Sequence, residues 1–98
     1  MSYHLEIVRE SRGNDAPLTK DEFCRACECF AELDLCADGM SADLIYDNDC
    51  IATLTLADGR IWTRYNEEEV LRVMLKVANV LHARVIGETG IVFTQAIY

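Results

Sequence analysis

The chain has 98 residues, 51% of them apolar, and a formal net charge of -8, which fits one domain with a single core over residues 1–98. Its apolar runs are far shorter than the roughly 20 residues of a membrane-spanning helix, and residues 1–6 lack the pattern of a signal peptide. We therefore expect a cytoplasmic domain with no membrane or nucleic-acid partner, since its acidic surface repels both.

The first predicted elements are a strand and a capped helix. Residues 3–9 alternate as a strand does, and residues 12–17 have the composition of a loop. Thr19 and Glu22 have the spacing of a capping box, which predicts a helix from there to about Leu33 or Leu35, ended by residues 37–39. Its apolar stripe is formed by side chains three or four apart: Phe23, Ala26, Cys27, Phe30 and Leu33.

The middle of the chain predicts a hairpin. Residues 50–57 and 60–65 alternate as strands, and Asp58-Gly59 between them suits a tight two-residue turn. Residues 40–49 are ambiguous, and within them residues 42–46 can form a short strand before a turn at 47–49. A second helix follows, with Asn66 as its cap and Glu69 three residues on, and residues 84–86 and 91–98 are the last strands, joined by a turn at 87–90.

The order β-α-(β)-β-β-α-β-β predicts an α+β fold. We expect an antiparallel or mixed sheet of about five strands with two helices packed on one face, which leaves the other face open. The turn at Asp58-Gly59 fixes the hairpin register, which pairs Thr55 with Trp62 and Thr53 with Arg64. The predicted outer face then holds Thr53, Thr55, Arg60, Trp62 and Arg64.

A lone Trp62 among threonines and arginines has the composition of a binding hot spot. The alternative is that a terminal segment covers Trp62, or that a one-residue bulge turns it inward.

The net charge is concentrated in one contiguous third of the chain. No Lys or Arg lies between Arg25 and Arg60, whereas eight acids do, and the rest of the chain has nine acids and nine bases. This distribution favours a cationic partner, and the alternative is a merely solubilising surface.

The sequence does not predict a catalytic or metal site. The five cysteines are odd in number without a secretory signal, which indicates reduced thiols. Cys29 points about 200° away from Cys27 around the predicted helix, so these thiols do not converge on a metal. No serine has a nucleophile-elbow context, and no local signal pairs His4 or His82 with a cysteine. We expect neither enzyme activity nor a cofactor.

Five segments together resemble a group of small bacterial proteins that includes toxin-neutralising immunity proteins. They are residues 3–9, 17–23, 58–61, 67–71 and, most strongly, 78–90. Phe23 and His82 depart from the group, which has Trp and Gly there, and the acidic middle matches nothing in it. The resemblance covers most of the chain and rests on structural residues, so it implies fold more than function and carries over no catalytic residue.

We therefore expect an immunity-type inhibitor that binds a basic toxin. The expected partner-binding residues are the acids of the middle segment with two aromatic anchors: Glu32, Asp34, Asp38, Asp43, Tyr46, Asp47, Asp49 and Trp62. The alternatives are a small regulatory or ligand-binding module that dimerises through the open sheet face, and a small enzyme in which a histidine meets a cysteine or carboxylate. A monomer or weak homodimer is expected.

Overall fold

The computed structural model describes residues 3–11, 14–65, 67–87 and 92–93. The two helices are α1 (Lys20–Glu28) and α2 (Glu68–Val80). The strands are β1 (Tyr3–Val8), β2 (Glu10–Ser11), β3 (Asn14–Asp15), β4 (Leu33–Leu35), β5 (Ser41–Tyr46), β6 (Asp49–Ala57), β7 (Arg60–Tyr65), β8 (Arg84–Gly87) and β9 (Val92–Phe93).

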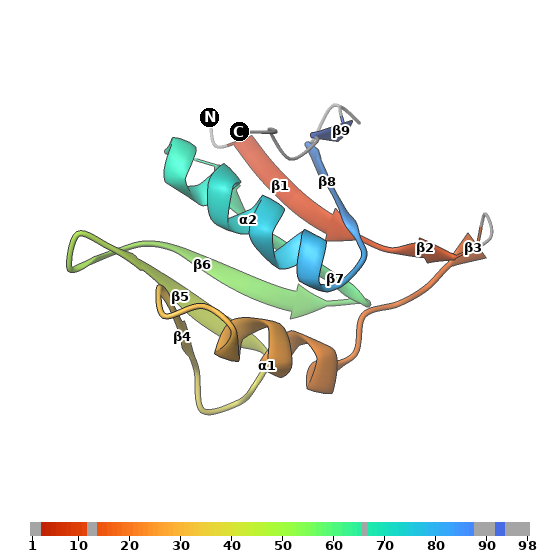
Figure 1. Ribbon diagram of the computed structural model, residues 1–98, viewed down its shortest axis with the longest axis horizontal. Helices are drawn as coiled ribbons and strands as arrows, with labels where there is room; N and C mark the ends of the chain where they lie inside the picture. Colours follow the sequence, from red (N-terminus) through yellow and green to blue (C-terminus); the bar gives the residue numbers. More distant parts are fainter. Residues whose placement is uncertain (1–2, 12–13, 66, 88–91, 94–98) are drawn as a thin grey trace.

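Within the described residues, seven strands form one sheet in the order β4-β5-β6-β7-β1-β8-β9, and every neighbouring pair is antiparallel. Strands β2 and β3 form a separate small ribbon. Both helices lie on the same side of the main sheet (Figure 1). The predicted α+β fold is confirmed, with more strands than the five or so expected.

The core lies between this sheet and the two helices. Helix α2 contacts β1, β7 and β8, while α1 contacts β4 and α2. Inward-facing strand residues alternate with exposed ones, as a half-buried sheet requires. The largest side chains with no solvent exposure are Phe23, Leu5, Ile7, Leu44, Leu54, Ile61 and Met74.

Helix α1 begins as predicted and ends earlier. The Thr19 hydroxyl accepts from the Glu22 amide at 3.2 Å, and the Glu22 carboxylate accepts from the Thr19 amide at 3.2 Å, which completes the capping box. The predicted end at Leu33 or Leu35 is wrong, because the helix stops at Glu28 and residues 33–35 pair with β5 as the edge strand β4. Residues 33–35 alternate apolar and polar, so they fit a strand as well as a helix, and sheet pairing decides between the two.

The two hairpins on either side of β6 use the same turn chemistry. Asp58 and Gly59 have φ of 54° and 74°, as the predicted tight turn requires. Asp47 and Asn48 have φ of 53° and 66°, so the ambiguous segment is a strand, β5, followed by a second turn of this kind. A Cβ on Gly59 would lie 2.6 Å from the Pro17 Cβ, because the turn packs closely on residues 17–18.

Helix α2 begins one residue later than predicted. Its N-cap is Glu67, whose extended backbone precedes the helix and whose side chain makes no capping hydrogen bond. The predicted cap, Asn66, lies outside the described residues. At the other end His82 has φ of 54°, the left-handed conformation in which helices commonly end on glycine. The predicted turn at 87–90 and strand at 91–98 fall largely outside the described residues.

Neither helix in the described part of the chain has the length and apolar composition needed to cross a bilayer.

Candidate protein-binding surface

In the described part of the chain, no ion pair involves the acidic middle segment, residues 26–59. Among the described residues, four arginine–glutamate pairs form: Arg9–Glu22, Arg60–Glu6 at 3.4 Å, Arg72–Glu69 at 3.7 Å and Arg84–Glu10 at 2.5 Å. None of them uses any of the eight acids between Arg25 and Arg60. Every neutralised carboxylate of the described residues therefore lies outside the middle segment, where Asp21, Glu67 and Glu68 are also without an ion pair.

Two of the unneutralised acids lie side by side on the open face of the sheet. Asp34 on β4 is directly opposite Asp43 on β5, and both alternate with inward-facing apolar residues. Like charges directly opposite on paired strands destabilise a sheet. The only described group that bonds to either carboxylate is the Thr53 hydroxyl on β6, which donates to Asp43 at 3.0 Å.

The other acids of this region lie at the two ends of β5. Asp38 lies in the β4–β5 loop, where its carboxylate accepts from the Met40 amide at 2.9 Å. Asp47 and Asp49 lie at the opposite end, at the exposed β5–β6 turn. We call these five residues, which follow β5 over roughly 20 Å, the acidic strip: Asp34, Asp38, Asp43, Asp47 and Asp49.

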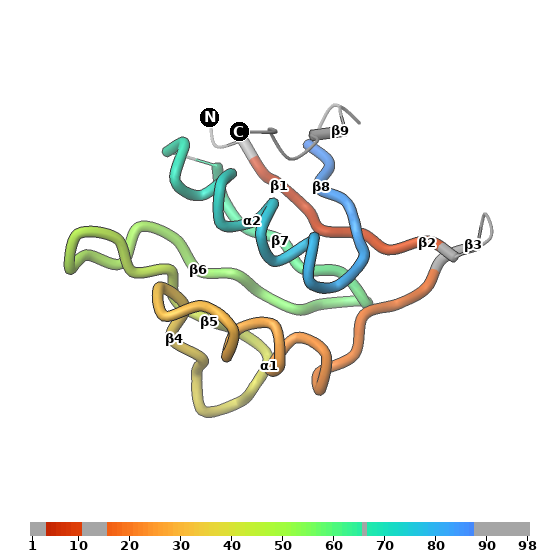
Figure 2. The backbone as a smooth tube through the Cα atoms, viewed as in Figure 1, coloured from red at the N-terminus to blue at the C-terminus, as the bar shows by residue number. Residues whose placement is uncertain are grey.

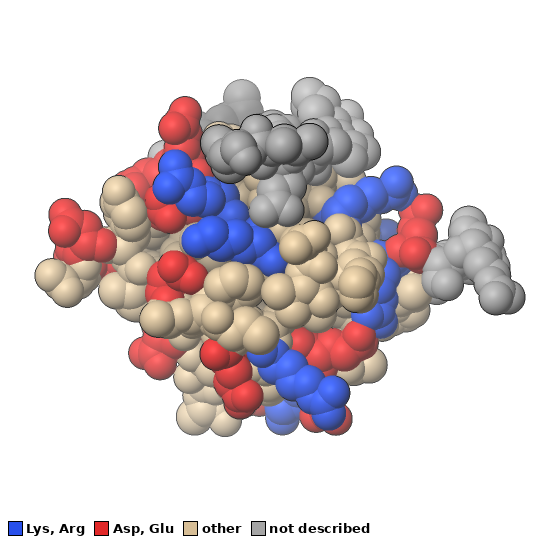
Figure 3. All heavy atoms as spheres, in the orientation of Figure 1, with Lys and Arg blue, Asp and Glu red and all other residues tan. Residues whose placement is uncertain are grey.

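The surface seen from the helix side shows the difference between regions of mixed charge and regions of acidic charge alone (Figure 3). Over most of it, basic and acidic side chains lie next to one another, while the tip of the β5–β6 hairpin at the left has acidic side chains without basic neighbours.

The remaining predicted binding residues are placed differently. Tyr46, 49% exposed, stands directly opposite Asp49 beside the β5–β6 turn and so adjoins the strip. Glu32 is half-buried just before β4, and its backbone carbonyl accepts from the Ile45 amide at 2.8 Å, so at least its backbone is structural. Trp62 lies on β7, apart from the strip, and its side chain is 41% exposed on the open face. It is neither covered nor turned inward.

A hollow separates Trp62 from the strip. The predicted pairing of Thr55 with Trp62 is confirmed, but the β6–β7 ladder ends there, so the predicted pair Thr53–Arg64 does not form. Farther along, the Thr63 hydroxyl donates to the Thr53 carbonyl at 2.9 Å in place of a ladder bond.

A bulge in β6 accompanies this separation. Leu44 lies opposite Ala52 and Ile45 lies opposite Cys50, so Ile51 is an extra residue on β6. A bulge bends its strand and increases the local twist, and the path of β6 curves away from β7 (Figure 2).

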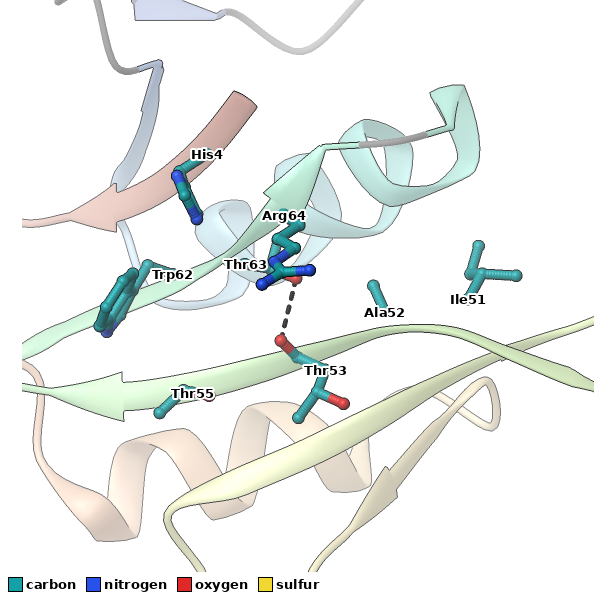
Figure 4. Close-up of a pocket in the computed structure, with 8 residues that line it drawn as sticks. All are labelled: His4, Ile51, Ala52, Thr53, Thr55, Trp62, Thr63 and Arg64. Atoms are coloured by element: carbon teal, nitrogen blue, oxygen red, sulfur yellow. Dashed lines mark hydrogen bonds between the residues drawn. The ribbon is translucent and has the colours of Figure 1, made fainter. Parts of the chain in front are cut away.

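The resulting hollow has a volume of about 510 Å³. Its wall and floor come from three strands, and the side chains of His4, Trp62 and Arg64 project from β1 and β7 beside it (Figure 4). The His4 and Trp62 rings lie 6.1 Å apart between centroids and are tilted by 56°. The full lining is His4, Ile51, Ala52, Thr53, Thr55, Trp62, Thr63 and Arg64.

The sequence could not show this hollow, because a bulge leaves no distinctive residue pattern here. The one available signal was Trp62 itself, whose position on the outer face followed from the turn.

The cysteines form no comparable site. All five are free thiols. Cys27 belongs to the core, and burial, with smaller contributions from Cys24 and Cys36, raises the pKa of its thiol to about 12. Such a thiol stays protonated and is a poor nucleophile. Within the described part of the chain, no three His, Cys, Asp or Glu side chains are grouped to hold a metal ion.

Comparisons with family models, with curated proteins and with solved structures found no match for this chain.

Proposed function

We propose that this chain is a non-catalytic inhibitor that binds a basic protein through the acidic strip. The observation that carries the proposal is the separation of the charges: every ion pair of the described residues uses an acid outside residues 26–59. A surface that only had to keep the protein soluble would not require five acids without an ion pair to lie along one strand and its two ends.

The arrangement costs stability, which favours a role in binding. Asp34 and Asp43 repel each other across two paired strands. A cationic partner would replace that repulsion with attraction, and its approach would be accelerated by the field of the strip, with association rates up to about 10⁸–10⁹ M⁻¹s⁻¹ at low salt. The open face of β4 and β5 leaves room for such a partner, because both helices lie on the other side of the sheet.

A toxin is the kind of partner that the sequence resemblance favours. One departure from the resembled group also has a backbone explanation, since residue 82, where that group has glycine, adopts the left-handed conformation that glycine favours. Five free thiols suit the reducing cytoplasm, where an immunity protein of this kind would meet its toxin.

The test uses two variants with the same net charge. The strip variant is Asp34→Asn/Asp43→Asn/Asp49→Asn, and the control variant is Asp21→Asn/Glu67→Gln/Glu68→Gln, which neutralises three exposed acids elsewhere. Immobilised wild-type protein and the control variant should retain the same protein from extracts of the native cell, and the strip variant should lose it.

Expression of the retained protein alone should then arrest growth, and co-expression of this chain should restore it. Equal retention by the two variants would contradict the role of the strip. A retained protein that does not affect growth would contradict the toxin assignment.

A further inference from the structure

We propose that the hollow between β6 and β7 binds a carboxylate carried by an extended segment of the same partner protein. This inference rests on the proposed function. It assigns the partner a second contact, in which an acidic group of the partner binds a basic group of this chain. Arg64 would hold the carboxylate, and Trp62 would pack against the apolar part of the segment.

The charge of the hollow comes from an arginine that the fold leaves without a carboxylate. Arg64 lies opposite His4 on β1 and lines the hollow. Two other arginines of this face, Arg60 and Arg84, are paired with Glu6 and Glu10, whereas no described carboxylate pairs with Arg64. In a chain with a net charge of -8, an arginine left unpaired beside a concave surface indicates an anionic group from outside.

The walls of the hollow suit a peptide. Trp62 offers a broad apolar surface beside the arginine, and Trp and Arg are the residues most enriched at the centres of protein interfaces. The Thr53 and Thr55 side chains lie along the β6 side, where their methyl groups can contact an apolar stem.

The openness of the hollow argues for a protein segment over a free metabolite. Small-molecule sites bury most of their ligand, whereas Thr53, Trp62 and Arg64 are all exposed. The hollow also lies on the same face as Asp34 and Asp43, one strand beyond β5, and Thr53 borders both: it lines the hollow and bonds to Asp43. A single partner would therefore carry basic groups over β4 and β5 and an acidic group over β7.

Trp62 is the only tryptophan of the chain and reports on the hollow directly. The probe is the tripeptide leucine-glutamate-leucine, blocked at both ends. The control peptide has glutamine in place of glutamate. We expect the glutamate peptide to change the Trp62 emission saturably, with a dissociation constant of about 1 mM. The glutamine peptide should bind at least about 10-fold more weakly, because it loses the charge-assisted hydrogen bonds.

Three variants locate the binding. Arg64→Gln should weaken the glutamate peptide at least about 10-fold, and Arg64→Lys, which keeps the charge without the fork of donors, should weaken it less. Arg25→Gln removes an exposed arginine on α1, outside the hollow, and should change nothing. Near-identical far-ultraviolet circular dichroism would show that each variant is folded.

The outcomes separate this inference from the proposed function. No saturable change, equal affinity for both peptides, or full binding by Arg64→Gln would overturn the hollow as a carboxylate site. Acetate that matches the peptide in affinity would overturn the assignment to a segment. A dimer seen by light scattering that Arg64→Gln dissociates would make a second copy the occupant and would also overturn it. None of these results affects the strip variant, whose loss of partner binding tests the proposed function alone.

Discussion

The two halves of the sheet use the same kind of side chain in different ways. In the half formed by β1, β7 and β8, Arg60 is paired with Glu6, and Arg84 is paired with Glu10 of the neighbouring ribbon strand β2. In the half formed by β4, β5 and β6, Asp34 and Asp43 stand opposite each other, and no described cation pairs with either. The positions of the acids that lack a counter-ion therefore describe the surface better than the total charge of the protein does.

A layer of buried apolar side chains stabilises the acidic half of the sheet. Beneath Asp43, the inward-facing Ala42 and Leu44 have no solvent exposure, and Leu54 on β6 has none either. Apolar burial stabilises the folded state by about 25 cal/mol per Å², so a buried layer of this kind outweighs the repulsion between the exposed Asp34 and the half-buried Asp43. The two carboxylates can stay opposite each other because the apolar core beneath them supplies the stability of this half.

The largest predicted effect tests whether the two halves are one folded unit. Phe23 of α1 is fully buried, and Phe23→Ala should lower the free energy of unfolding by about 3–5 kcal/mol. Urea unfolding followed by Trp62 emission and by circular dichroism should still give one coincident transition. Two separate transitions would mean that the halves fold independently. Val80→Ala, at a 40% exposed site on α2, is the control and should change stability by less than about 0.5 kcal/mol.

The next effect concerns a neutralised acid. The hydrogen bond from Arg9 lowers the pKa of Glu22 to about 2, below its ordinary value of 4.5. Glu22→Gln should cost about 1–2 kcal/mol at pH 7, because it removes the ion pair and weakens the capping box.

The sign of the pH dependence follows from that lowered pKa. The folded state binds the Glu22 proton less tightly than the unfolded state, so the contribution is fully present above about pH 4.5 and is lost as the pH falls through 2. The stability difference between wild type and Glu22→Gln, measured by urea unfolding, should shrink over that window. A difference that stays constant down to pH 2 would show that the carboxylate charge is not responsible.

The smallest effect has the opposite sign. Asp34→Asn removes one of two carboxylates that face each other and should raise stability by about 0.2–1 kcal/mol. The gain should be largest at low salt, because screening weakens the repulsion it relieves. Asp49→Asn is the matched control, since Asp49 lies opposite Tyr46 and not another acid. If Asp34→Asn destabilises the protein, repulsion between Asp34 and Asp43 does not lower the stability of the folded state, and this part of the account is wrong.

The fold could be predicted from the sequence wherever local chemistry decides it. Thr19 and Glu22 fix the start of α1, and Asp58 with Gly59 fixes the turn and the first pairs of the hairpin. Where α1 ends could not be predicted, because residues 33–35 become a strand only by pairing with β5. The loss of the Thr53–Arg64 pair depends likewise on how β6 bends between its two neighbours.

The candidate site could be predicted only in part, for a related reason. The sequence shows that the acids of residues 26–59 have no nearby basic residue. It does not show which of the other glutamates are neutralised, because Glu6 and Glu10 find partners 54 and 74 residues away. Arg64 becomes recognisable as the unpaired arginine of the open face only once those pairs are placed.

The central claim is that the acidic strip attracts a basic partner, and the ionic-strength dependence of the association rate tests it most directly. With the purified partner, stopped-flow measurements should show a steep fall in rate with added salt for wild type and for Asp21→Asn/Glu67→Gln/Glu68→Gln. The dependence should be much flatter for Asp34→Asn/Asp43→Asn/Asp49→Asn. Equal slopes for the two variants would show that only net charge matters, and would contradict the account.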